Sequence, residues 1–220
     1  MKWLELPGMC LRARFLFIVF ATVNIAACSQ VASLISPLLK PSVSTELTAL
    51  RAGDYRIDKS HATVLFKVGH LGLSTYVGRF NSFDATMRFD PENVSNSELD
   101  AVVTMESVDC NDSSMENTLR SSDWFNTKRF PTARFISQSA RKQGDDSIVF
   151  EGTLRWREHS RPITLTGTFN GGALNRLNGK YTLGFSGSTV FKRSDFEVDQ
   201  YLSLVDDEIH IEVYAEFQRQ

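Results

Sequence analysis

The sequence predicts an all-β fold, an eight-stranded antiparallel barrel with a short helical insert between the third and fourth strands. Apolar residues recur at every second position in several long segments, which is typical of strands with one buried face. Clusters of Gly, Asn, Asp and Pro separate these segments, as expected for turns. Strands of this length and number suit a closed barrel, because closure removes the unpaired edges that an open sheet would expose.

The first three strands are predicted between residues 55 and 106. Gly69, Gly72 and Gly78 are expected to let the chain turn between the first and the second strand, and Asp90–Asn93 supplies the next turn. The residues expected to face the interior are Ala62, Val64, Phe66 and Val68, then Phe83, Ala85, Met87 and Phe89, then Leu99, Ala101, Val103 and Met105.

A helical pattern interrupts the strands after residue 110. Asn111 or Asp112 is the expected N-cap, and Met115 and Leu119 lie one helical turn apart. A helix inserted into an otherwise all-β chain is a candidate lid for one end of the barrel.

Five further strands are predicted between Pro131 and the C-terminus. Polar or glycine-rich stretches separate them, among them Arg157–Arg161 and the turn that begins at Asn170. Their inward rows are Ala133, Phe135 and Ser137; Ile148, Phe150, Gly152, Leu154 and Trp156; Ile163, Leu165, Gly167 and Phe169; Tyr181, Leu183 and Phe185; and Ile209, Ile211, Val213, Ala215 and Phe217.

A barrel of this size either fills with its own side chains or holds one ligand. The 16 phenylalanines of the chain would suit a filled core. Several of them, however, share a face with Gly152, Gly167 or Ala133, and small residues between large ones leave room along the axis. The sequence therefore favours a ligand tunnel, and a filled core is the alternative.

The composition is that of one ordinary globular domain, with 220 residues, 42% hydrophobic residues and a net charge of −2. A chain with this charge balance is not expected to bind nucleic acid.

The N-terminal residues 1–27 are predicted to be a lipoprotein-type signal peptide, because basic residues precede an uncharged run from Phe15 to Ala27. Ile25–Cys28 resembles the lipobox of bacterial lipoproteins, which predicts acylation of Cys28; an ordinary cleavage site is the alternative. Residues 28–52 are then a tether, in which scattered leucines could also rest on the membrane or the barrel, and residues 53–220 are the barrel domain. Either Met1 or Met9 could be the start.

Few side chains are candidates for catalysis or metal binding. His70 shares the parity of the apolar row in the first strand, so its imidazole is expected to point inward near one end of the tunnel. His61 has the opposite parity, which disfavours a metal site shared by the two histidines beside Asp58. Cys110 is expected to pack rather than react. With no nucleophile elbow, phosphate loop or metalloprotease signature in the sequence, no enzyme activity, metal or cofactor is predicted.

Three motifs resemble those of the YceI-like family: YRIDKSHATVLFKVGHLGLSTYVGRF at 55–80, LRSSDWFNTKRFP at 119–131 and FKRSDF at 191–196. Their order and their span, from Tyr55 to Phe217, make the match specific as a whole. The resemblance implies a lipocalin-like barrel that binds long isoprenoid or similar lipid chains in an elongated apolar interior. The chain departs from the family pattern in turns and near the tunnel mouth, at Ala62, Thr118, Glu158 and Glu197.

The inward rows and the motifs together predict the ligand contacts. His70 is expected to orient a head group by hydrogen bonding. Arg120 and Arg193 either pair with Asp123 and Asp195 to hold the helical insert against the late strands, or meet a polar or phosphorylated head group. The predicted contacts are Val64, Phe66, His70, Phe80, Met105, Leu119, Arg120, Trp124, Phe125, Phe135, Phe150, Phe185 and Arg193.

Two functions follow from these expectations. The first is a lipid-anchored barrel, held in the periplasm and at the outer membrane through Cys28, that carries or stores an isoprenoid, quinone-like or other amphipathic lipid. Ser29 favours the outer membrane, because an aspartate after the acylated cysteine tends to mark inner-membrane retention. The second is a barrel with a filled interior that serves as an envelope stress or scaffolding module. Both functions leave the oligomeric state open.

Overall fold

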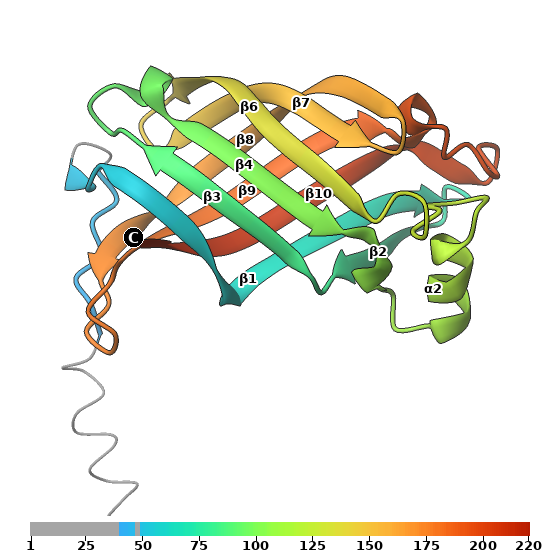
Figure 1. Ribbon diagram of the computed structural model, residues 1–220, viewed down its shortest axis with the longest axis horizontal. Coiled ribbons are helices and arrows are strands. Elements are labelled where there is room, and N and C mark those ends of the chain that lie inside the picture. The colour runs from blue at the N-terminus through green and yellow to red at the C-terminus, as the bar shows by residue number, and fades with distance from the viewer. Residues whose placement is uncertain (1–39, 47–48) are drawn as a thin grey trace, which may run out of the picture. The chain divides into compact units, whose positions relative to one another are not determined.

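The computed structural model describes residues 40–46 and 49–220. The predicted signal peptide, the predicted lipidation site Cys28 and most of the predicted tether lie outside the described residues. From Ser42 to Gln220 the chain forms one compact unit. In this unit a strongly twisted antiparallel sheet closes on itself (Figure 1).

The sheet follows the order β10-β9-β8-β7-β6-β4-β3-β1-β2-β5, and pairing between β10 and β1 closes the ring. β3 and β2 pair with successive parts of β1, and β4 and β5 pair with β3 and β2 in turn. Thus β2 and β3 together count as one interrupted strand, and β4 and β5 together count as another. The ten labelled strands therefore make a barrel of eight, as predicted. Their bounds are β1 Gly53–His70, β2 Ser74–Phe80, β3 Phe83–Phe89, β4 Glu98–Thr104, β5 Val108–Asp109, β6 Thr132–Gln143, β7 Ser147–Trp156, β8 His159–Leu174, β9 Tyr181–Lys192 and β10 Val205–Arg219.

β1 is 18 residues long and changes partners halfway along the barrel. Its first part, from Gly53 to Arg56, pairs with β3, and its last part, from Val64 to His70, pairs with β2. Between these parts the register with β10 shifts, from Ile57 to Ala62. A β-bulge of this kind bends the strand and increases its twist, which lets β1 follow both partners.

The segment after the first turn differs from the prediction. Ser74–Phe80 is strand β2 and not part of a glycine-rich turn. Gly72 has a φ of 64° and supplies the turn. Gly78 instead allows close packing, because a Cβ atom at this position would lie 2.3 Å from Cζ of Phe66.

The predicted helical insert is present as α2, Ser113–Arg120, which lies between β5 and β6 at one end of the barrel (Figure 1). Asp112 is the N-cap: its carboxylate accepts hydrogen bonds from the backbone N–H groups of Ser114 and Met115, at 2.9 and 3.2 Å. Leu119 is buried and attaches the helix to the barrel. Among the described helices, none is long and apolar enough to cross a membrane.

Part of the predicted tether belongs to the barrel structure. Ser44 forms an antiparallel bridge with Gly172 in β8, with hydrogen bonds of 3.0 and 2.7 Å between their backbones. Leu50 is 5% exposed and packs in the core. The leucine therefore stabilises the domain.

Buried side chains form two clusters along the barrel, and Phe83, Ile163 and Val213 contact both. At the end opposite α2, aromatic rings pack tightly: the centroids of Phe89 and Phe169 are 5.2 Å apart, and those of Phe169 and Phe185 are 4.4 Å apart. The cluster nearer α2 contains a second series of rings in contact, namely Phe66, Phe80, Phe125, Trp156 and Phe196.

Candidate functional site

The barrel interior holds a cavity of about 240 Å³, whereas a single water molecule needs only about 10–15 Å³. Every strand except β5 contributes to its wall, which is almost entirely apolar. Tyr55, Phe89 and Phe169 fill the end opposite α2 and lie outside the lining, while Leu119 and Trp124 line the cavity at the α2 end. The interior is therefore filled at one end and open along the rest of its length.

Most of the predicted ligand contacts meet in this wall. The lining includes every predicted contact except His70 and Arg120, that is, Val64, Phe66, Phe80, Met105, Leu119, Trp124, Phe125, Phe135, Phe150, Phe185 and Arg193. For those of them that lie in strands, the inward direction follows from the alternation in which successive side chains point to opposite faces. That these residues bind a ligand stays a prediction.

The inward position predicted for His70 is wrong. Its side chain is exposed and does not line the cavity. The pairing of β1 with β10 shifts register between Val68 and His70, where His70 comes to lie opposite Val205. The additional residues of this shift are on β10, because β1 keeps regular pairing with β2 as far as His70 and Ser74. His70 therefore keeps the parity of Val68, but as the last residue of β1 it lies beyond the cavity wall and cannot orient a head group inside the barrel.

Arg120 also lies outside the cavity wall. Its Nε donates to the carbonyl of Glu106 at 2.9 Å and its Nη2 to the carbonyl of Val108 at 2.7 Å, with Glu116 as an ion-pair partner at 3.4 Å. Arg120 thus fastens the end of α2 to the segment that joins β4 and β5. A structural role agrees with one of the two predicted alternatives, although the contact is made with the β4–β5 segment and not with the late strands.

Arg193 lines the cavity but is engaged by the backbone. The side chain is 3% exposed, and its guanidinium donates four hydrogen bonds to carbonyls of the following loop and of the start of β10. Burial lowers the pKa of this guanidinium below its usual value, and the nearby carboxylates of Asp207, Asp199 and Asp206 oppose the shift. The four acceptors are the carbonyl oxygens of Val198, Gln200, Val205 and Asp206, at 2.7, 2.8, 2.8 and 2.9 Å.

The sequence did not single out several other residues of the wall. Thr189 and Phe191 belong to it because β9 continues to Lys192. The stretch from Gly184 to Ser188 has no apolar row that would have signalled a strand, although Thr189 keeps the parity of Phe185. Other lining residues, such as Ile209, Ile211 and Val213, were predicted to face inward without being named as contacts.

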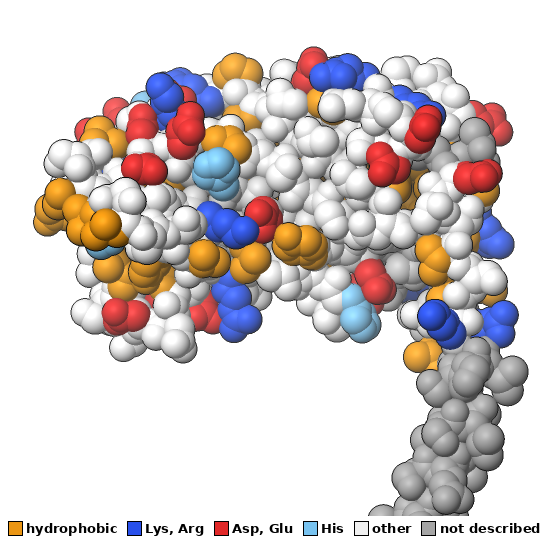
Figure 2. All heavy atoms as spheres, turned by 180° about the vertical axis from the view of Figure 1, so that it is seen from behind, with side chains coloured by type: hydrophobic (Ala, Val, Ile, Leu, Met, Phe, Trp, Pro, Cys, Tyr) orange, Lys and Arg blue, Asp and Glu red, His pale blue; other side chains and the backbone are white. Residues whose placement is uncertain are grey.

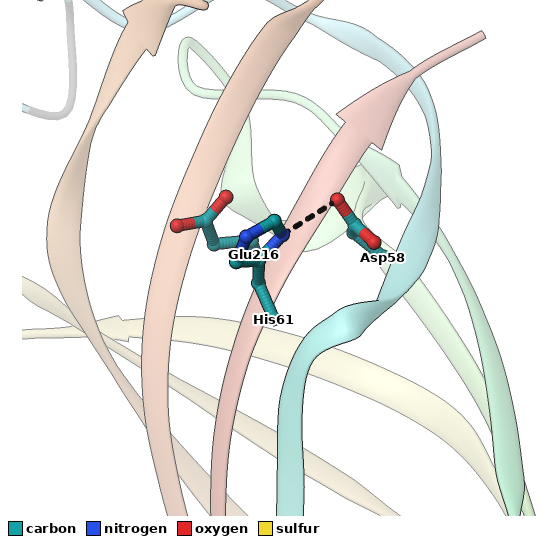
Figure 3. A group of neighbouring side chains, drawn as sticks. All are labelled: Asp58, His61 and Glu216. Atoms are coloured by element: carbon teal, nitrogen blue, oxygen red, sulfur yellow. Dashed lines mark hydrogen bonds and ion pairs between the residues drawn. The ribbon is translucent and has the colours of Figure 1, made fainter. Parts of the chain in front are cut away.

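Outside the cavity, Asp58, His61 and Glu216 lie together at the bend of β1 (Figure 3). Their possible ligand atoms are within 4.8 Å of one another, so these three side chains could coordinate a divalent cation. The Asp58 carboxylate already accepts from His61 Nδ1 at 3.0 Å, from Gln218 Nε2 at 2.5 Å and from the N–H of Ser60 at 3.0 Å. In this arrangement the carboxylate ties the bend of β1 to β10.

We expect the pair of His61 and Asp58 to depend on pH. The Asp58 carboxylate raises the pKa of His61 above its usual 6.5, and hydrogen bonding lowers the pKa of Asp58 below its usual 3.8. The His61 contribution to stability is complete below 6.5 and is lost as pH rises through the raised pKa. The Asp58 contribution is complete above 3.8 and is lost as pH falls through the lowered pKa. NMR titration should give His61 a pKa above 6.5 that returns toward 6.5 in Asp58→Asn. An unchanged value in the variant would contradict the pairing.

Comparison with known proteins identifies the family. The model of the YceI-like domain matches residues 55–217. A UPF0312 protein from Shewanella denitrificans is 35% identical over 171 residues, covering 77% of this chain and 89% of the relative. A UPF0312 protein from Vibrio vulnificus is 34% identical over 168 residues, covering 74% of this chain and 88% of the relative.

Solved structures share the architecture. A YceI protein from Campylobacter jejuni is 28% identical, with a TM-score of 0.62, and the alignment covers 70% of this chain and 91% of that chain. BcnA from Burkholderia cenocepacia is 23% identical with a TM-score of 0.67, covering 73% and 98%. A polyisoprenoid binding domain from Saccharophagus degradans is 13% identical with a TM-score of 0.57, covering 77% and 100%, and so shares the fold. On the evidence of its motifs, its barrel and its relatives, the chain belongs to the YceI-like family.

Proposed function

We propose that the protein binds one long-chain amphipathic lipid, of isoprenoid, quinone-like or similar type, inside the barrel and carries or stores it in the cell envelope. The observation that carries the proposal is the apolar cavity, which strands from the whole circumference of the barrel enclose. An apolar wall of this kind favours a hydrocarbon chain, because burial removes the chain from water. The polyisoprenoid binding domain with the same fold supports the class of ligand.

Apolar side chains at the α2 end offer a route into the cavity. Leu73 is 84% exposed on the turn between β1 and β2, and Tyr201 is 62% exposed on the loop before β10. The two segments lie side by side, because the N–H of Leu71 donates to the carbonyl of Leu204 at 2.7 Å. Tyr201 stacks on Trp124, which lines the cavity. Figure 2 shows hydrophobic side chains gathered at the left end of the molecule in that view. A lipid chain could therefore pass from an apolar surface into the interior.

The protein acts, on this proposal, by binding and not by catalysis. The cavity wall contains just two charged side chains, Asp84 and Arg193. Asp84 pairs with Arg56 at 2.5 Å and with Lys59 at 3.0 Å. Arg193 donates to four backbone carbonyls between Val198 and Asp206. Neither charged side chain of the described wall is therefore free to act as an acid, base or nucleophile. The alternative of a scaffolding module with a filled barrel has less support, since the cavity leaves the interior partly open.

Native mass spectrometry of the purified protein, followed by extraction into organic solvent, tests the proposal. We expect one lipid molecule per barrel, and extraction into organic solvent should release it as a long-chain species. A barrel that stays empty after purification and after incubation with lipid micelles would refute lipid binding and favour the scaffolding role.

Lipid anchoring through Cys28 is the proposed basis of the envelope location. Acylation requires the thiol sulfur, so Cys28→Ser should abolish labelling of the protein by radioactive palmitate in cells and leave the precursor uncleaved. Cys110→Ser is the matched control, because Cys110 lies between β5 and α2 and should not affect labelling. Labelling that persists in Cys28→Ser would exclude the lipoprotein assignment.

A further inference from the structure

Two polar atoms in the cavity wall have no hydrogen-bond partner within the protein. They are the indole Nε1 of Trp156 and the hydroxyl Oγ1 of Thr189. Both residues line the cavity, and they are 6% and 8% exposed. Because an unpaired polar atom that has lost its water destabilises a protein, such atoms in a native interior call for an explanation.

The two atoms belong to the same part of the interior. Thr189 and Phe191 lie two positions apart on the inner face of β9. The ring of Phe191 is 5.5 Å from the ring of Phe196, which is 5.6 Å from the ring of Trp156. Trp156 also packs on Phe125, with a centroid distance of 5.4 Å. Both residues therefore belong to the half of the cavity nearer α2, and Trp156 is in contact with other aromatic rings there.

The charges of the wall are already engaged. Four of the five N–H groups of Arg193 donate to backbone carbonyls. The Asp84 carboxylate is paired with Arg56 and Lys59. An anionic head group inside the cavity would therefore lose its water without gaining a free cation, which is costly in an apolar environment.

We propose that Trp156 Nε1 and Thr189 Oγ1 form a polar station in this half of the wall, in which either atom can bind an uncharged oxygen of the lipid, such as a carbonyl, ester or amide oxygen. The indole N–H can only donate, so it requires an acceptor, and the threonine hydroxyl can donate as well. This inference rests on the proposed lipid binding and specifies the ligand: a neutral lipid with an acceptor oxygen is preferred to a plain hydrocarbon and to an anionic lipid.

A competition experiment with three probes of equal chain length tests the station. Octadecane, octadecanamide and octadecanoate are delivered to the purified protein from the same neutral detergent at pH 8, and native mass spectrometry gives the occupancy of each. The wild-type protein should favour the amide over both other probes by about tenfold or more. Equal occupancy by octadecane, or a preference for octadecanoate, would overturn the inference while leaving lipid binding intact. If none of the probes binds, both the station and the proposed function fail.

Thr189→Val removes the hydroxyl at nearly constant volume and should reduce the preference for the amide by about fivefold, with octadecane occupancy unchanged. Thr164→Val, at an exposed position on β8, is the matched control and should keep the full preference. Trp156→Phe should reduce the preference in the same way. An amide preference that is unchanged in both cavity variants would overturn the inference.

Stability of the lipid-free protein provides a second measurement. Since the Thr189 hydroxyl has no protein partner, Thr189→Val should unfold at the same temperature as the wild-type protein or at a higher one. A clear fall in melting temperature would show that the hydroxyl is already satisfied in the folded protein and would overturn its assignment to the ligand.

Discussion

Leucine in place of Gly187 should abolish lipid binding and leave the barrel folded. Gly187 lines the cavity on the inner face of β9, between Phe185 and Thr189. A Cβ atom there would lie 3.7 Å from the carbonyl oxygen of Thr166 and 3.7 Å from Cβ of Val213, which are ordinary contact distances. The backbone can therefore accept a side chain, whose remaining atoms must occupy the space available to a ligand.

We expect the affinity of Gly187→Leu for octadecanamide to fall by about 100-fold or more, equivalent to roughly 2.7 kcal/mol. Native mass spectrometry measures the lost occupancy, and urea denaturation shows that the variant remains folded. Gly184→Leu is the matched control, because Gly184 lies on the same strand at the opposite parity, and a Cβ atom there would meet Cβ of Asn170 at 3.5 Å. Undiminished binding by Gly187→Leu would place the ligand outside the cavity.

Among the variants proposed for this protein, Arg193→Met should cause the largest loss in the free energy of unfolding. Methionine fills similar space but donates no hydrogen bonds, so four carbonyls around the loop from Val198 to Asp206 would lose their partner. Leaving buried acceptors unpaired costs about 1–3 kcal/mol each when water cannot reach them. Some relaxation of the loop is expected, and we predict a loss of about 3–5 kcal/mol in the free energy of unfolding.

Urea denaturation checks this value, and thermal unfolding should show a fall of roughly 10 °C in the melting temperature. Arg193→Lys should rescue little, because an ammonium group cannot reach four carbonyls that surround a planar guanidinium. Arg155→Met, on the outer face of β7, is the control and should change the free energy of unfolding by less than about 0.5 kcal/mol. A similarly small effect of Arg193→Met would mean that water replaces the guanidinium.

The alternation of apolar residues was sufficient to predict the barrel, because each strand has one face toward the interior. For the same reason, the aromatic and aliphatic part of the cavity wall, including Phe66, Phe150 and Phe185, could be predicted. Periodicity does not report where the cavity ends along a strand. His70 keeps the parity of the apolar row but is the last residue of β1 and lies beyond the cavity wall, and nothing in the local sequence reports how this end pairs with a strand more than a hundred residues away.

Polar side chains were harder to predict than apolar ones. The partners of Arg120 and Arg193 are backbone carbonyls, and their positions depend on how distant loops fold. Thr189 follows a stretch of glycines and serines in which the strand has no apolar row. Its role is apparent only when the neighbouring strands show that its hydroxyl has no partner.

Pairing between the first and the last strand has a consequence for how the chain reaches its native state. β10 supplies 15 residues that join β1 to β9, and the N–H of Gln220 donates to the carbonyl of Asp54 at 2.9 Å. The ring cannot close until β10 is available, so closure of the barrel must await synthesis of this strand. A truncated chain without β10 would expose the unpaired edges of β1 and β9, which favour aggregation.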